Sequence, residues 1–250
     1  MKYSYKWLPL KSLATTSVIA TMSMTFVYAQ TTVQKIYWLR YYGQFKLGEK
    51  IAWHLEADDR FYFDTNNGFQ LIIHNHLHYK INPYLDVATG LSYSRAHSNK
   101  NPNLVVPEWR PFQEVNIDFF PKLKQHKPIT FRLRVDERFI HQNDGTELQT
   151  GTKYSTRIRF RLQTAWQLTS FNEGERKLII KANDEYMVHR GDVLTTFDQN
   201  RIYGALEYYF RPNLSLEAGY LNLYQANGTE KHFLRHILRI TLTHKLSLIR

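Results

Sequence analysis

The chain lacks cysteine, and it has little unbroken apolar sequence. Among its 250 residues there is no cysteine, which excludes a disulfide framework and any thiolate metal site. Beyond the first 29 residues, no stretch reaches the roughly 18 consecutive apolar residues of a membrane-spanning helix. A mature chain that enters a membrane must therefore do so as a closed β-barrel, because only helices and closed barrels satisfy every backbone polar group in lipid.

The N-terminal segment has the composition of an export signal. Residues 1–29 contain three lysines and no acidic residue, followed by an apolar stretch over 13–27 and the small-residue site Val27-Tyr28-Ala29. This order is typical of a cleaved secretory signal peptide, and no helix-capping signal supports an ordinary helix there. We therefore expect a signal peptide over 1–29 and one β-barrel domain over 30–250.

A period of two in hydrophobicity dominates the middle of the chain. Two segments, 129–139 and 154–168, alternate apolar side chains with arginine over their length. Strict alternation places one set on each face of a β-strand. The apolar members are Phe131, Leu133, Val135, Ile158, Phe160 and Leu162, and the polar ones are Arg132, Arg134, Asp136, Arg157, Arg159 and Arg161. Such long alternation favours a transmembrane barrel with apolar residues toward lipid and arginines toward the lumen.

The same alternation extends over the rest of the mature chain. Eleven candidate strands lie between Ile36 and the C-terminus, separated by turn-rich segments that tend to alternate between short and long. We predict an all-β fold, an antiparallel transmembrane β-barrel of about 10 to 12 strands, with the short turns facing the periplasm. An odd number of strands is unusual for such barrels, so residues 30–35 are candidates for a further strand.

The polar faces predict a charged lumen. In a confined space, arginines and carboxylates should pair, because a guanidinium offers two hydrogen bonds to a carboxylate. One interpretation is a structural ion network that fills the barrel, and the other is a narrow polar channel with some preference for anions. The predicted members are Glu56, Asp58, Glu114, Asp118, Arg132, Arg134, Asp136, Arg138, Arg157, Arg159, Arg161, Glu185, Arg201 and Glu207.

Histidines and serines are the candidate metal-binding and catalytic residues. His74, His76 and His78 share one strand face, but metal binding would require their rings to converge with help from a neighbouring strand, so we expect no metal. No G-x-S-x-G, H-E-x-x-H, phosphate-loop or dinucleotide motif is present. A catalytic triad assembled from separate strands could use His141 with Ser94 or Ser155. We expect no enzyme and no cofactor.

The charge balance also bears on partners. The formal net charge is +11, but the arginines alternate with apolar residues and are matched by acids, so they do not form a one-sided footprint for nucleic acid. We expect contacts with outer-membrane lipids and the phosphates of lipopolysaccharide, and with the barrel-assembly machinery during biogenesis.

Several short polar motifs follow one another in a fixed order along the chain. They are Glu108-Trp109-Arg110 with Gln113, the ladder Arg132, Arg134, Asp136, Arg138 and Phe139, Arg157 to Arg161, Asn183 with Glu185, Gln199-Asn200-Arg201, and Glu217-Ala218-Gly219-Tyr220. Together they resemble a family of uncharacterised outer-membrane proteins called domain of unknown function 2490. The resemblance covers about Trp38 to Leu246 and implies a Gram-negative outer-membrane barrel, with no established activity or catalytic residues.

Two alternatives differ in class from a structural barrel or channel. One is an outer-membrane enzyme, a hydrolase or acyltransferase, that acts on lipid. The other is a soluble periplasmic, lipocalin-like binder whose apolar strand faces turn inward around a ligand. The direction of the apolar faces separates this binder from the membrane barrel, because the two architectures place the arginines on opposite sides of the wall.

Overall fold

The computed structural model describes residues 30–98, 100–119, 126–172, 175–191, 196–228 and 231–249. The expected signal peptide over 1–29 therefore lies outside the described residues. Within the described part, no helix is long and apolar enough to cross a membrane.

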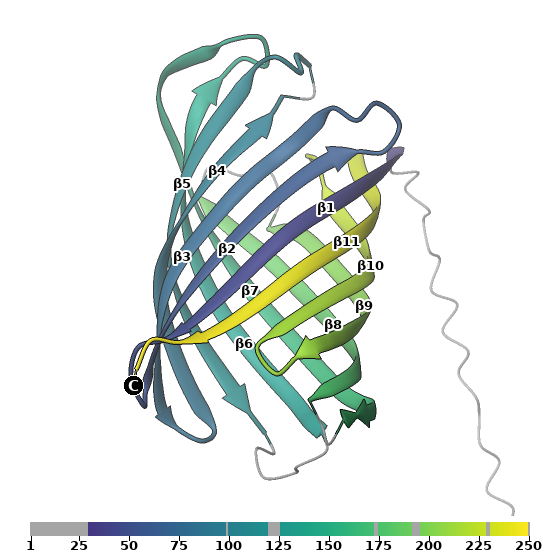
Figure 1. Cartoon of the computed structure of the whole chain (residues 1–250). Helices are drawn as coiled ribbons and strands as arrows, with labels where there is room; N and C mark the ends of the chain where they lie inside the picture. Colours follow the sequence, from purple (N-terminus) through teal and green to yellow (C-terminus); the bar gives the residue numbers. More distant parts are fainter. Residues whose placement is uncertain are drawn as a thin grey trace, which may run out of the picture.

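The described chain forms eleven β-strands joined by turns and loops (Figure 1). The strands are β1 (Gln30–Lys46), β2 (Ile51–Tyr62), β3 (Gly68–Asn82), β4 (Leu85–His97), β5 (Val105–Asp118), β6 (His126–Asn143), β7 (Leu148–Phe171), β8 (Arg176–Gly191), β9 (Phe197–Arg211), β10 (Leu214–Ala226) and β11 (Lys231–Ser247). Each predicted strand is confirmed, and most extend further than the apolar pattern indicated.

The eleven strands close into a single barrel in which each strand pairs with the next one in sequence. These sequential pairs are all antiparallel, but the closing pair, β1 with β11, is parallel. An odd number of alternating strands makes the first and the last point the same way, so the parallel pair follows from the strand count. Our prediction of a purely antiparallel barrel is therefore wrong for this one pair of strands. Residues 30–35 lengthen β1 and form no further strand.

Strand register fixes the width of the barrel. The path of paired residues that leaves β1 at Lys46 and crosses every strand returns to β1 at Thr32, a stagger of 14 residues. For eleven strands, this stagger implies a strand tilt of about 40° and a backbone radius of about 11 Å. Long side chains from opposite walls can therefore meet near the barrel axis.

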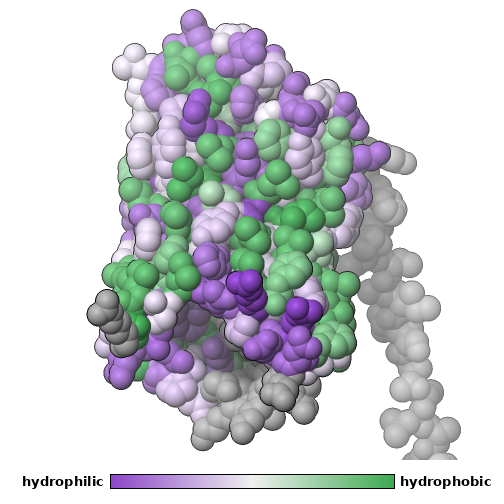
Figure 2. All heavy atoms as spheres, viewed as in Figure 1, coloured by the Kyte–Doolittle hydropathy of each residue, from purple (hydrophilic) through white to green (hydrophobic). Residues whose placement is uncertain are grey.

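Alternation along the strands separates the two surfaces of the wall. Large apolar side chains such as Leu162, Ile202 and Leu206 are exposed on the outside, while Arg134, Asp136 and Glu185 are buried inside. Figure 2 shows apolar residues over much of the visible wall, with hydrophilic residues gathered toward both ends. The inside is not uniformly polar, because one apolar cluster lines the wall where β9, β10, β11 and β1 adjoin. Its members are Ile36, Trp38, Tyr203, Ala205, Leu221, Leu223 and Ile237.

The two ends of the barrel differ. Short turns at 47–50, 83–84 and 212–213 lie at one end, drawn at the bottom of Figure 1, and the C-terminal end of the chain lies there too. The opposite end carries longer connections. Two of these are joined, because Ser98 Oγ donates to the carbonyl of Gly145 at 2.9 Å and Asn101 Nδ2 donates to that of Thr146 at 3.1 Å.

Candidate functional site: the charged interior

The largest cluster of charges inside the barrel centres on Glu185 of β8. Arg159 Nη2 donates to both carboxylate oxygens at 3.0 Å, and Arg132 donates to Oε1. Arg201 Nη1 approaches Oε2 at 3.5 Å from the other side. Strand register explains the convergence: Arg132 and Arg161 are directly opposite on β6 and β7, and Glu185 is opposite Arg161 on β8. One carboxylate therefore offsets the repulsion of several neighbouring guanidinium groups.

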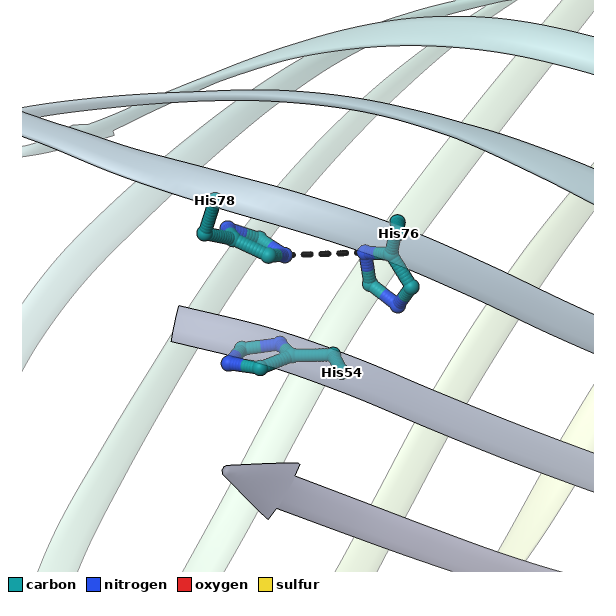
Figure 3. Close-up of side chains that lie close together, drawn as sticks. All are labelled: His54, His76 and His78. Carbon is teal, nitrogen blue, oxygen red and sulfur yellow. Dashed lines mark hydrogen bonds between the residues drawn. The ribbon is translucent and has the colours of Figure 1, made fainter. Parts of the chain in front are cut away.

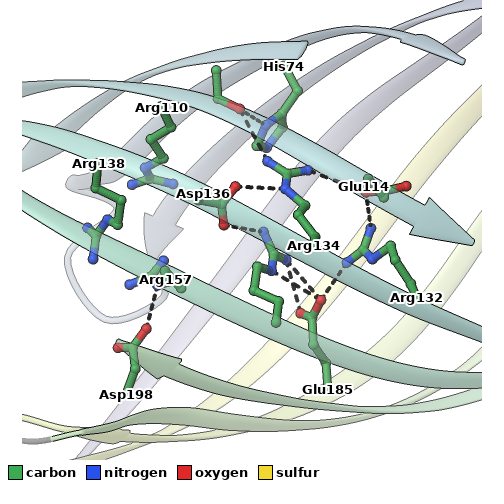
Figure 4. Close-up of polar contacts among 12 residues, drawn as sticks. His74, Arg110, Glu114, Arg132, Arg134, Asp136, Arg138, Arg157, Glu185 and Asp198 are labelled. Carbon is green, nitrogen blue, oxygen red and sulfur yellow. Dashed lines mark hydrogen bonds and ion pairs between the residues drawn. The ribbon is translucent and has the colours of Figure 1, made fainter. Parts of the chain in front are cut away.

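Asp136 and Glu114 complete this central cluster (Figure 4). Arg134 Nε donates to Asp136 Oδ1 at 2.7 Å, and Arg159 Nη1 lies 3.6 Å from Oδ2. Glu114 Oε2 is 3.4 Å from Arg132 Nη1 and 3.9 Å from Arg134 Nη1. Each carboxylate faces two or more guanidinium groups, so the ion pairs form a network across β5, β6, β7 and β8.

A second cluster lies closer to the end with the longer connections. Glu108 accepts two hydrogen bonds of 2.6 Å from Arg110 and two, of 2.5 and 3.1 Å, from Arg138. Beside it, Arg157 Nε lies 2.5 Å from Asp198 Oδ2. Since Arg157 is on β7 and Asp198 is on β9, this pair passes over the inner face of β8.

Two further clusters complete the ring of charge. In the first, Lys181 Nζ lies 2.6 Å from Glu207 and 2.8 Å from Glu217, and Arg239 Nη2 donates to Glu217 at 3.1 Å. In the second, on β1 and β2, Arg40 pairs with Glu56 and lies 3.4 Å from Asp58. Asp58 also pairs with Arg60 at 3.1 Å.

Aromatic rings fill the space between these charges. The guanidinium of Arg134 stacks 3.5 Å from the centre of the Phe112 ring, and that of Arg60 lies 3.9 Å from the Trp38 ring. Arg239 lies in the same way over Tyr203, at 3.8 Å. Such cation–π contacts stabilise guanidinium groups that are largely removed from water. Guanidinium groups and aromatic rings are therefore stacked on one another in the interior.

The structure places all fourteen predicted lumen residues on the inner face, but they do not form one uniform set. Twelve of them make ion pairs within 4.0 Å with the partners described above. Asp118, near the end of β5, instead accepts a hydrogen bond of 2.7 Å from Thr130. Arg161 forms no ion pair within that distance with any residue the structure describes.

Several network members were not among the predicted residues. Most have the same alternation as predicted neighbours, so their inward direction could have been found from sequence. The inward direction of Asp198 could not have been found in this way, because the strand register shifts where β9 meets β8. Phe197 and Gln199 pair with consecutive residues of β8, so Asp198 lies between them as a bulge. The missed members are Arg40, Arg60, Glu108, Arg110, Lys181 and Asp198.

The candidate catalytic residues are not brought together. Ser94 and Ser155 are buried inside the barrel, and Ser94 accepts a hydrogen bond of 2.7 Å from Gln70. The ring of His141, near the end of β6, instead contacts the carbonyl of Gln142 at 3.3 Å. No hydrogen bond joins His141 to either serine among the described residues.

Comparison with known proteins places the chain in a family. The family model described as "Protein of unknown function (DUF2490)" matches residues 36–233. The chain belongs to this family. The DUF2490 match covers β1 from Ile36 onward, β2 through β10 and the first residues of β11, so every strand that contributes a charge to the network lies at least partly within it. The resemblance inferred from the ordered motifs is confirmed.

Other comparisons add little to the DUF2490 assignment. No curated protein matches the chain. Among solved structures, the crystal structure of the siderophore receptor PirA from Pseudomonas aeruginosa is similar, with 15% identity and a TM-score of 0.29. That match covers 74% of this chain and 37% of the receptor. A likeness at this level assigns neither strand topology nor ligand to the DUF2490 chain.

Proposed function

We propose that the protein is an integral outer-membrane β-barrel whose interior is closed by its own ion pairs, and that its role is structural. The observation that carries this proposal is the inside-out distribution of side chains. Ile202 and Leu162 on the outer wall are 58% and 52% exposed, whereas Arg134 and Asp136 inside are 3% and 1% exposed. In water such a wall would expose far more contiguous apolar surface than soluble monomers do.

The outer surface has the chemistry expected of a lipid-facing wall. Apolar side chains point outward from every strand, and the aromatic residues Trp109 and Trp166 are exposed among them. A shallow groove of about 520 Å³ runs over small residues such as Gly204 and is lined mainly by apolar groups, including Leu206 and Leu238. A groove with this lining suits an acyl chain. These features favour the membrane barrel over the lipocalin-like binder, whose apolar residues would face inward.

The interior favours a closed barrel over an open pore. Ion pairs connect strands that are not neighbours in the wall, as between Arg132 on β6 and Glu185 on β8, and between Lys181 on β8 and Glu217 on β10. At a backbone radius of about 11 Å, these side chains and the aromatic rings between them occupy the space that a wide channel would need. Dismantling the network would leave charges without partners, which opposes spontaneous opening.

Fractionation tests the membrane part of the proposal. We expect the mature protein in the outer-membrane fraction, released only by detergent. On a gel, the unheated and heated samples should migrate differently, because a folded barrel resists unfolding by detergent at room temperature. Recovery from a periplasmic extract without detergent would contradict the proposal and favour the soluble binder.

Conductance tests the closed interior. In planar bilayers we expect the purified wild-type protein to give no current above background. The double variant Arg159→Ala with Glu185→Ala removes two members of the central cluster and should give measurable channel activity. Steady current from the wild-type protein would contradict the closed barrel.

A narrow channel with preference for anions is the second candidate, and it has one specific observation in its favour. Arg161 lacks an ion pair among the described residues, and Arg235 hydrogen-bonds to Gln34 and Gln225, which carry no charge. Unpaired guanidinium groups along a lumen are the usual means of attracting anions. A wild-type current whose reversal potential shifts toward the chloride equilibrium potential in a chloride gradient would support this candidate.

The proposal extends to partners but includes no catalytic step. Lysines in the connections, such as Lys100, are available for lipopolysaccharide phosphates, and folding into the outer membrane requires the barrel-assembly machinery. No reaction is proposed, because His141, Ser94 and Ser155 make no mutual contacts from which a mechanism could be built. Lipid turnover by the purified protein would contradict this view.

A further inference from the structure

Three histidine rings meet on the inner wall near the end of the barrel that carries the short turns (Figure 3). His76 and His78 come from β3, and His54 of β2 is directly opposite His76 in the register. One ring nitrogen from each histidine can be chosen so that all three lie within 4.8 Å of one another. The neighbouring strand thus supplies the converging ring without which the histidines of β3 could not hold a metal.

Two of the three rings are hydrogen-bonded to an oxygen atom from outside the trio, and the third lies near a carboxylate. His78 Nδ1 lies 2.6 Å from Asp86 Oδ1, and His54 Nδ1 lies 2.9 Å from the Tyr42 hydroxyl. His76 Nε2 lies 3.3 Å from Glu56 Oε1. Histidines that bind metals almost always have such a carboxylate or oxygen partner, which fixes the ring and increases its basicity as a ligand.

The spacing of the nitrogens suits a small ion. His78 Nε2 and His76 Nδ1 are 2.8 Å apart and share one hydrogen bond. Two imidazoles on a tetrahedral zinc ion have nitrogens about 3.3 Å apart, since each Zn–N bond is about 2.0–2.1 Å. Small rotations of the two rings would make room for a metal ion in place of the shared proton. A similar rotation would bring a ring nitrogen of His54 to the same ion.

Burial and charge favour an ion over a solvated group of side chains. His76 and His78 are 4% and 8% exposed, while the side chain of Asp86 is 29% exposed and leaves an approach from the barrel end. Asp86 and Glu56 place carboxylates beside the rings, which favours a cation there, and Arg40 offsets part of this charge through its ion pair with Glu56. His74 is not part of the group, because its Nδ1 lies 2.5 Å from Ser92 Oγ.

We propose that His54, His76 and His78 bind one divalent transition-metal ion of the zinc class, with a fourth position open to water or a small ligand. Neutral imidazoles are ligands for Zn²⁺, Co²⁺, Ni²⁺ and Cu²⁺, and three of them with an open position match a tetrahedral zinc site. The site does not depend on the proposed membrane role.

The test uses the untagged full-length mature protein, refolded in detergent, with Zn²⁺ and Co²⁺ as the probes. Dialysis against Zn²⁺ followed by elemental analysis should give one equivalent per chain. Co²⁺ should give the intense visible absorption of a four-coordinate complex. His54→Gln should weaken binding by more than about 100-fold, and Asp86→Asn, which removes an outer-shell partner, by about 10–100-fold.

The matched control is His141→Gln, which alters a histidine at the opposite end of the barrel and should leave binding unchanged. Heat-dependent gel migration identifies variants that fold, and only these are compared. A Co²⁺ spectrum equal to that of the hydrated ion would overturn the proposal. So would zinc binding that His54→Gln and His141→Gln reduce to the same extent.

Discussion

Glu185 is the residue on which the interior network depends most, because three guanidinium groups converge on its carboxylate. Replacing it with glutamine keeps the shape and removes the negative charge, leaving buried cations without their main partner. We expect Glu185→Gln to lower the free energy of unfolding by about 3–5 kcal/mol.

Urea unfolding of the refolded protein, with linear extrapolation to water, measures this loss. The control is Glu49→Gln, in the exposed turn between β1 and β2, which should change stability little. An equal effect of the two substitutions would argue against a central role for Glu185.

Gly90 is required by close packing inside the barrel. A Cβ atom there would lie 2.5 Å from the carbonyl oxygen of Asn75 and 2.6 Å from the ring of Phe112, which stacks on Arg134. Gly90→Ala should therefore cost about 1–3 kcal/mol through overpacking. Gly204 faces outward with nothing within 4 Å of the same position, so Gly204→Ala should be tolerated. Thermal unfolding of both variants compares them, and equal melting temperatures would contradict the packed interior.

Asp144 stabilises the connection between β6 and β7 through hydrogen bonds to its carboxylate. Its carboxylate accepts hydrogen bonds from the Thr146 hydroxyl and from the backbone amides of Glu147 and Thr146, which lower the pKa of Asp144 from 3.8 to about 2. A lowered pKa means that this carboxylate stabilises the connection above pH 3.8 and that the contribution is lost as the pH falls through about 2.

Amide hydrogen exchange at Thr146 and Glu147, corrected for the intrinsic rate, should show protection that falls over this range. In Asp144→Asn the protection should be lower and independent of pH. Protection in the wild-type protein that stays constant from pH 5 to 2 would refute this role.

At the scale of the strands, alternation in the sequence was sufficient to predict which way most side chains point. The phase of β6 and β7 places Phe160 and Leu162 outside and Arg132 and Arg159 inside, as the period of two predicted. Alternation is a local feature of the sequence, and it leaves only two possible orientations for each strand: apolar face outward or apolar face inward. One residue of error would reverse a whole strand, so a consistent pattern over ten residues is strong information.

Ion-pair partners could not be predicted in the same way, because a pair depends on register and on the distance across the barrel. Arg132 meets Glu185, 53 residues further along the chain and two strands away. The histidine trio has the same origin: His54 joins His76 only because the hairpin between β2 and β3 places them opposite each other. The parallel closure likewise depends on counting every strand correctly.

The parallel pairing of β1 with β11 can be tested by engineered disulfides, since the chain has no cysteine of its own. Val33 is paired with Leu234, and Leu39 with Ile240, and each double cysteine variant should cross-link under mild oxidation. The mismatched pair Val33 with Ile240 should not. Cross-linking of the mismatched pair in preference to the matched ones would show an antiparallel closure.

For the whole molecule, the central proposal is that the apolar outer wall faces lipid and encloses a closed, charged interior. Three features of the molecule agree with this arrangement. The stagger sets a radius at which opposite side chains can meet, the network pairs most of the buried charges, and the histidine trio lies at one end of the same inner wall. A protein of this design resists opening and keeps its polar groups away from the hydrocarbon.

The most direct test compares two adjacent positions of β9. Leu206 is 48% exposed on the outer wall, and Ala205 is 7% exposed inside. Each is replaced by cysteine, labelled with a fluorophore and reconstituted in vesicles of lipids with brominated acyl chains. We predict strong quenching by the brominated chains at Leu206→Cys and almost none at Ala205→Cys. Equal quenching at the two sites, or quenching of Leu206→Cys by aqueous iodide alone, would contradict the lipid-facing wall.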